Sequence, residues 1–174
     1  TIAGTAAEDQ TLTAANTLAD EDGLGTIAYR WKRDGADISG ASGSTYTLTQ
    51  DDVGAVITVA ATYTDGEGTT ESVTSAATAT VTNVNDDPTG SVTLSGTAAE
   101  DQTLTAANTL ADEDGLGTIA YQWKRDGVDI SGASGSTYLL TQDDVGAVIT
   151  VAASYTDGEG TTESVTSAAT ATVT

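Results

Sequence analysis

Apolar and polar residues alternate in short runs along the chain, and Gly and Asp residues separate these runs. Between positions 26 and 32, Ile27, Tyr29 and Trp31 fall on one face, while Arg30 and Lys32 fall on the other. A period of two is typical of strands in a half-buried sheet, and no segment shows a convincing helical period. The pattern therefore predicts an all-β protein made of short strands joined by turns.

The same pattern predicts the remaining strands. In the last strand of the first half, Val73, Ala77, Ala79 and Val81 are expected to point inward. A terminal strand is expected ahead of Gly4, and residues 91–95 are expected to form the corresponding strand in the second half. The other expected strands cover residues 12–18, 44–49, 55–63 and 71–81.

The chain contains one module twice. Residues 1–82 and 93–174 align without a gap at a period of 92, with six differing positions. Three of these differences, Arg30/Gln122, Thr47/Leu139 and Thr62/Ser154, fall on the faces predicted to point outward, where packing tolerates change. We expect two repeat domains, 1–82 and 93–174, joined by an acidic linker over 83–92 that includes the start of the next strand. Both halves stop at the same point of the module, as expected of a monomeric fragment of a longer tandem array.

Composition excludes several classes of function. The chain has 26 Asp and Glu against five Lys and Arg, a net charge of −21, which argues against nucleic acid and anionic membranes as partners. No apolar run approaches the roughly 20 residues of a membrane span. Cys and His are absent, which removes disulfides, thiolate metal sites and the usual catalytic bases. We therefore expect neither an enzyme nor a small-molecule substrate.

Two motifs resemble known families. An inward Trp31 followed by Tyr-x-Leu-Thr-x-x-Asp-Val-Gly-x-x-Ile-x-Val, from Tyr46 to Val59, resembles the immunoglobulin-like (Ig-like) sandwich. The string from Tyr29 to Gly35, with the Ile-Ser-Gly-Ala that follows, resembles Ig-like repeats of giant, type I-secreted RTX-type adhesins. The resemblance implies two tandem Ig-like antiparallel β-sandwich domains. It also implies an extracellular place on a bacterial surface.

The connector carries the most specific local motif. Residues 83–88, Asn-Val-Asn-Asp-Asp-Pro, resemble the calcium-binding Asp-x-Asn-Asp-Asn-x-Pro linker of cadherins, with Asn83 in place of the first Asp and Asp87 in place of the last Asn. Carboxylate and amide oxygens are ligands that Ca²⁺ prefers. The competing interpretation is that these are solvated turn residues. In an Ig-like sandwich the chain enters at one end and leaves at the other, so acidic loops of both copies are expected at the joint. The predicted Ca²⁺ ligands are Glu8, Asp51, Asp52, Asn83, Asn85, Asp86, Asp87, Asp112, Asp114 and Asp157.

These observations favour a structural function. The leading hypothesis is an extender segment of a giant bacterial adhesin, stiffened by Ca²⁺, that holds a distal adhesive region away from the cell for surface attachment and biofilm formation. Its partners would be neighbouring repeats of the same chain. One alternative is an Ig-like module in which one sandwich face or loop set binds a partner protein or glycan; a binding screen of the outward surface of Lys32, Arg33, Lys124 and Arg125 would test it. The other is an accessory domain of a large secreted enzyme.

Overall fold

The computed structural model describes all 174 residues and contains strands, turns and two short 3₁₀ helices. It divides into two units, Thr1–Val84 and Asn85–Thr174, which we call unit 1 and unit 2. The division falls within the residues assigned to the linker, 83–92. The prediction of an all-β fold is confirmed. No helix has the length and apolar character needed to cross a membrane.

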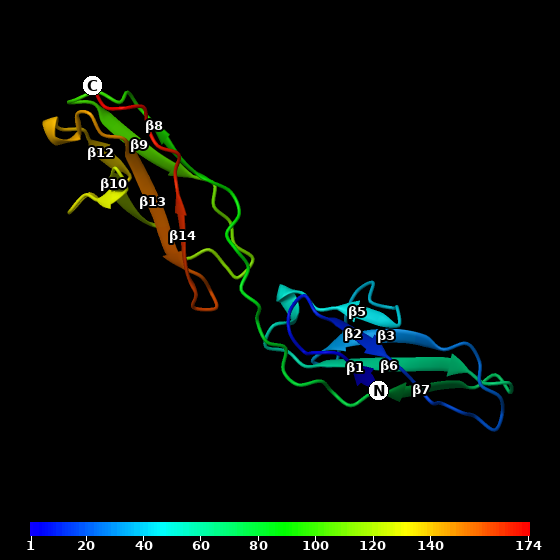
Figure 1. Cartoon of the computed structure of the whole chain (residues 1–174). Helices are drawn as coiled ribbons and strands as arrows, with labels where there is room; N and C mark the ends of the chain where they lie inside the picture. Colours follow the sequence, from blue (N-terminus) through cyan, green and yellow to red (C-terminus); the bar gives the residue numbers. More distant parts are fainter. The chain divides into compact units, whose positions relative to one another are not determined.

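Unit 1 consists of two antiparallel sheets (Figure 1). One sheet has the order β1-β2-β5, from Ile2–Ala3, Thr11–Ala14 and Thr45–Thr47. The other has the order β4-β3-β6-β7, from Ala36–Asp37, Ala28–Arg33, Ile57–Thr64 and Thr70–Thr74. The 3₁₀ helix η1, Gln50–Asp52, connects the two sheets between β5 and β6.

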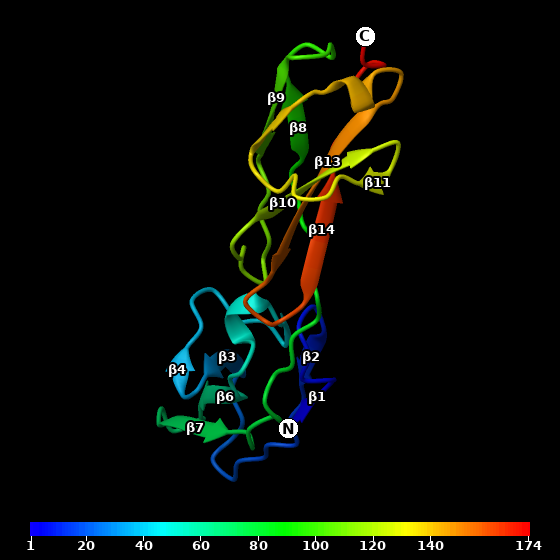
Figure 2. The ribbon, with the colours of Figure 1, turned by 90° about the vertical axis from the view of Figure 1, so that its left-hand side faces the viewer.

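Unit 2 repeats this topology with longer first strands (Figure 2). Its three-stranded sheet has the order β12-β9-β8, from Thr137–Leu139, Thr103–Asn108 and Val92–Ser95. Its four-stranded sheet has the order β11-β10-β13-β14, from Val128–Asp129, Ala120–Arg125, Ile149–Thr156 and Thr162–Thr166. The 3₁₀ helix η2 spans Gln142–Asp144.

A tryptophan forms the centre of each core, as the alternation in the sequence predicted. Trp31 and Trp123 are fully buried. Each indole N–H donates to a backbone carbonyl, that of Gly43 at 2.9 Å and that of Gly135 at 2.8 Å. Burial of the ring is therefore achieved without leaving its single donor unpaired.

The expected strand over 71–81 is wrong in its second half. β7 ends at Thr74, Val73 is 48% exposed, and Val81 alone of the four residues predicted inward is buried. The reason is that the hydroxyls of Ser75 and Thr78 accept the N–H groups of Val59 and Ile57, at 3.1 and 3.0 Å. Ser75 and Thr78 are three residues apart, whereas their partners Val59 and Ile57 on β6 are two residues apart. The regular hydrogen bonding of paired antiparallel strands is therefore lost in this segment.

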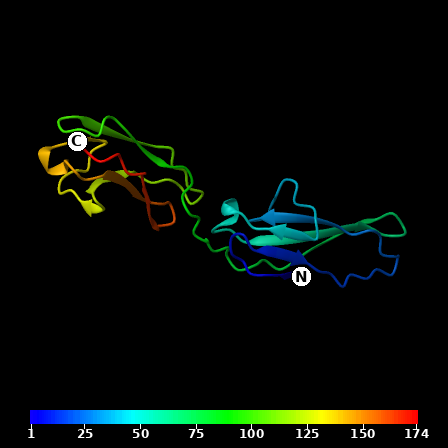
Figure 3. The same cartoon turned by 45° about the horizontal axis from the view of Figure 1, so that its top comes forward.

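The two ends of each unit carry different loops. In unit 1 the β2–β3 loop (15–27) and the β6–β7 loop (65–69) lie at one end and η1 lies at the other (Figure 3). The chain leaves unit 1 at the η1 end, where Ala7 forms a parallel bridge with Thr82. It enters unit 2 beside the β9–β10 loop, where Thr89 bridges Ala111. The entry and exit predicted from the sequence are confirmed within each unit.

Candidate metal centre

The β9–β10 loop of unit 2 is held by Asp112. One carboxylate oxygen accepts the N–H of Asp114 at 2.9 Å, and the other accepts the hydroxyl of Tyr155 on β13. Burial and this hydrogen bond raise the pKa of Tyr155, so the hydroxyl remains a donor. Asp112, one of the predicted ligands, therefore positions this loop through its two hydrogen bonds.

The β13–β14 loop contains a carboxylate with one unsatisfied oxygen. Oδ1 of Asp157 accepts the N–H groups of Glu159 and Thr161, at 2.9 and 2.8 Å. Oδ2 is buried and has no hydrogen-bond partner, and the residue is only 7% exposed. A buried carboxylate oxygen without a partner is costly, and a bound cation or an ordered water would satisfy it.

A glycine joins this loop to the β9–β10 loop. The N–H of Gly158 donates to the backbone carbonyl of Asp114 at 2.9 Å. A Cβ atom on Gly158 would lie 2.5 Å from that carbonyl oxygen, so any side chain would separate the loops. The absence of a side chain therefore allows the backbones that carry Asp114 and Asp157 to approach closely.

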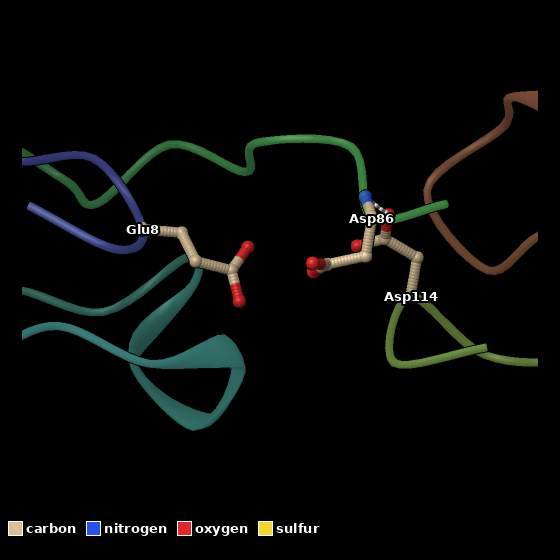
Figure 4. A group of neighbouring side chains, drawn as sticks. All are labelled: Glu8, Asp86 and Asp114. Carbon is tan, nitrogen blue, oxygen red and sulfur yellow. Dashed lines mark hydrogen bonds between the residues drawn. The ribbon is translucent and has the colours of Figure 1, made fainter. Parts of the chain in front are cut away.

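The second part of the connector is bound to unit 2. The N–H of Asp86 donates to Oδ2 of Asp114 at 2.8 Å (Figure 4). The side-chain amide of Asn85 donates to Glu163 on β14 at 3.0 Å. Asp114 is 4% exposed and Asp86 is half-buried. Oxygen atoms from the connector and from one loop thus meet at this end of unit 2, and Asp87 remains exposed.

The first part of the connector is bound to unit 1. Glu8, on the segment before β2 (Figure 4), is 2% exposed, and its Oε2 accepts the N–H of Val84 at 3.3 Å. Its own N–H donates to the carbonyl of Thr82 at 2.9 Å. Asn83 between them is half-buried. Glu8 therefore fixes the end of the chain that leaves unit 1.

Asp52 is not available as a metal ligand, which corrects the predicted set. Its side chain is fully buried, with Oδ1 bound to Arg33 at 2.7 Å. Oδ2 accepts the Tyr46 hydroxyl and the Thr49 N–H, at 2.8 and 2.9 Å. Burial raises the pKa of this carboxyl, but the Thr49 N–H, Arg33 and Tyr46 outweigh it and lower the pKa overall. Asp51 beside it has an 83% exposed side chain, 3.9 Å from Arg33.

Unit 1 carries an acidic group that the sequence prediction left outside its ligand set. One oxygen each from Asp20, Asp22 and Asp65 lies within 4.8 Å of the others, and this group could hold a metal ion. These residues are the repeat counterparts of Asp112, Asp114 and Asp157, so the period of 92 was the signal for them. Tyr63 donates to Asp20 at 2.9 Å, as Tyr155 does to Asp112.

The donor set suits a hard cation. Asp86 on the connector and Asp114 on the β9–β10 loop offer carboxylate oxygens, which Ca²⁺ and Mg²⁺ prefer, and Asp157 lies on the loop that Gly158 ties to Asp114. Two carboxylates about 6 Å apart repel by roughly 0.7 kcal/mol even in water, and by more when buried. A bound cation would reduce this repulsion, and a cation that also contacted the β13–β14 loop would satisfy Oδ2 of Asp157. Tyr155 and Glu163, which hold this arrangement in place, were not predicted, because their contacts depend on the paired strands.

No family model and no curated protein matches the sequence. Among solved structures, the chain is similar to one described as a Ca²⁺-stabilized adhesin that helps an Antarctic bacterium reach out and bind ice. The two share 15% identity with a TM-score of 0.37, and the similarity covers 95% of this chain. The chain spans 43% of the length of that solved chain.

Proposed function

We propose that the chain is a pair of Ig-like extender repeats of a giant bacterial surface adhesin, with Ca²⁺ stiffening the joint. In this proposal the repeats are non-catalytic, are exported by the type I route, and support surface attachment and biofilm formation. The single observation that carries the metal is the buried, unpartnered Oδ2 of Asp157 in a loop tied to Asp114. The pairing orders β1-β2-β5 and β4-β3-β6-β7 support the Ig-like assignment.

The residues that would hold Ca²⁺ are Asp86, Asp114 and Asp157. When bound, the ion supplies a positive charge that neutralises these carboxylates, and it performs no chemical step. Glu8 holds the N–H of Val84, and Asp114 holds the N–H of Asp86. Because only Asn85 separates these two anchored groups, few backbone dihedrals of the connector would stay free.

Stiff joints between repeats would let the array hold its far end away from the cell. The end-to-end distance of a flexible chain grows with the square root of its length, whereas that of a stiff series of domains grows in proportion to the number of domains. A Ca²⁺ requirement would also delay stiffening until the chain is outside the cell. The high negative charge would keep the chain soluble before that.

Ion pairs within each unit argue against the alternative of a cationic binding face. Lys32 contacts Asp37 at 2.8 Å, and Lys124 contacts Asp129 at 2.6 Å. Arg33 and Arg125 are both bound to buried aspartates, each at 2.7 Å. A partner would therefore have to compete with existing pairs for all four cations.

Calorimetry tests the proposal on the whole chain. Titration with Ca²⁺ should give binding heat, and unfolding of unit 2 should shift to higher temperature. A ligand at about 100 times its Kd stabilises the native state by about 2.7 kcal/mol. Mg²⁺ at the same concentration is the control, because it requires a stricter octahedral geometry. An unfolding profile that is identical in Ca²⁺ and in chelator would refute the proposal.

A further inference from the structure

Unit 1 has an open apolar groove of about 650 Å³ beside its first strand. Apolar side chains of Leu18, Tyr29, Val59, Ala61 and Val73 contribute to its walls. The groove lies between β1 and the irregular segment after β7, whose residues 74–79 form the far wall.

The same side chains are covered in unit 2. Leu110, the counterpart of Leu18, is 6% exposed and belongs to the hydrophobic core. Val165 packs against that core, whereas its counterpart Val73 is 48% exposed. The groove beside β8 in unit 2 is smaller, about 370 Å³, and Leu110 does not line it. Since these counterpart residues are identical, their own chemistry cannot explain the difference.

Residues 85–92 provide the cover in unit 2. Val92 at the end of this segment is 5% exposed and is part of the core. The N–H of Thr109 donates to the carbonyl of Ser91 at 3.0 Å. Thr89 exchanges two backbone hydrogen bonds with Ala111, at 2.8 and 3.1 Å. The segment is thus an added strand on the β9–β10 loop.

The corresponding backbone groups of the β2–β3 loop in unit 1 are unpaired. Thr17 and Ala19, the counterparts of Thr109 and Ala111, make no backbone hydrogen bond with the rest of unit 1. The pairing register is also the same, because Ile2 faces Ala14 as Leu94 faces Ala106. A strand in this groove would therefore find the same hydrogen-bond partners as residues 85–92 do.

We propose that this groove is the docking site for an extended strand with the sequence of residues 85–92, Asn-Asp-Asp-Pro-Thr-Gly-Ser-Val, joined directly ahead of Thr1. The terminal valine fills the groove beside Leu18, and the threonine pairs with Ala19. Strand addition of this kind combines backbone hydrogen bonds with a side-chain pocket. The aspartate at the second position reaches Asp22, the counterpart of Asp114, so the strand fits the unit at both of its ends.

A glycine makes the docking specific. Gly90 has φ +90°, and a Cβ atom there would lie 2.2 Å from the carbonyl oxygen of Thr109. The corresponding glycine of the docked strand meets the carbonyl of Thr17 in the same way. A strand with alanine at this position cannot approach closely, and this distinguishes the connector sequence from a general apolar peptide.

Hydrogen exchange on an extended chain tests the docking. The eight residues are placed ahead of Thr1 of the full chain, and amide exchange is measured by NMR in chelator. The amides of Thr17 and Ala19 should exchange at least about tenfold more slowly than in the unextended chain, as expected for newly paired groups. The amides of Thr109 and Ala111 provide the internal reference for the paired state.

Two control extensions decide the outcome. One carries alanine at the glycine that corresponds to Gly90, and the other has the eight residues in scrambled order. Both should leave Thr17 and Ala19 unprotected. No protection by the native extension, or equal protection by either control, would overturn the proposal. Because chelator is present throughout, this result is independent of whether the chain binds Ca²⁺.

Discussion

Burial separates two kinds of acidic residue. Five carboxylates of this chain are buried, and two of them, Asp52 and Asp144, are each paired with an arginine. Of the other three, Glu8 and Asp114 each accept an N–H of the connector, and Asp157 lies in the loop that Gly158 ties to Asp114. A buried carboxylate requires compensation by a cation or by several donors. Arginine supplies this in the first group, and we propose that Ca²⁺ supplies it beside Asp114 and Asp157.

Asp157→Asn should abolish most of the Ca²⁺ response of unit 2. The asparagine oxygen can still accept from Glu159 and Thr161, so the loop remains folded, but the charge of Oδ2 is lost. Without Ca²⁺ the variant should unfold no more easily than the parent chain, because an uncompensated buried charge has been removed. Calorimetry in Ca²⁺ and in chelator measures both effects. Asp65→Asn is the matched control in unit 1, and an equal loss of the unit 2 response in both variants would contradict the assignment.

Asp52→Asn should lower the stability of unit 1 by about 1–3 kcal/mol at neutral pH, since Arg33 and Tyr46 lose a charged partner. The pKa of Asp52 is lowered from 3.8 in the folded state. Its contribution is therefore present above pH 3.8 and is lost as the pH falls through the lower folded value. Urea unfolding between pH 7 and pH 2 should show the parent and variant converging at low pH. A difference in the free energy of unfolding that stays constant over this pH range would argue against ionisation of Asp52 as the cause.

At the scale of strands, the alternation in the sequence predicted the faces of β3, because Trp31 is buried and Arg30 is exposed. It failed at Val73, which is 48% exposed within β7, and after Thr74, where Ser and Thr hydroxyls accept the N–H groups of β6. A hydroxyl can bond either to solvent or to a neighbouring strand, and spacing alone does not distinguish these outcomes. Spacing also does not reveal that Asp52, in η1, pairs with Arg33 on β3.

Thr78→Val should destabilise unit 1 by about 1–3 kcal/mol, because the buried Ile57 N–H loses its acceptor. Valine keeps the shape of the side chain, so packing changes little. The measurement is the urea midpoint of unit 1, followed by Trp31 fluorescence in chains that also carry Trp123→Phe. Thr80→Val in the same segment is the control, since Thr80 is exposed and should tolerate the change. Equal effects at both positions would show that loss of the hydroxyl bond is not the cause.

For the molecule as a whole, the two copies provide an internal comparison. Leu18 and Val73 are less buried in unit 1 than Leu110 and Val165 are in unit 2. Burial of apolar surface stabilises by about 25 cal/mol per Å². Unit 1 should therefore be the less stable unit when Ca²⁺ is absent.

The single tryptophan of each unit allows this order to be measured. Trp123→Phe leaves Trp31 to report unit 1, and Trp31→Phe leaves Trp123 to report unit 2. In chelator, the Trp31 signal of the first variant should unfold at lower temperature than the Trp123 signal of the second. The reverse order would mean that the difference in burial does not govern stability.

Small-angle X-ray scattering of the whole chain, in chelator and in millimolar Ca²⁺, tests the central claim most directly. If Ca²⁺ stiffens the connector, it should narrow the range of conformations and increase the maximum dimension. Asp157→Asn should weaken this change while leaving the fold intact. Superimposable scattering curves for the parent chain in chelator and in Ca²⁺ would contradict the proposed extender mechanism.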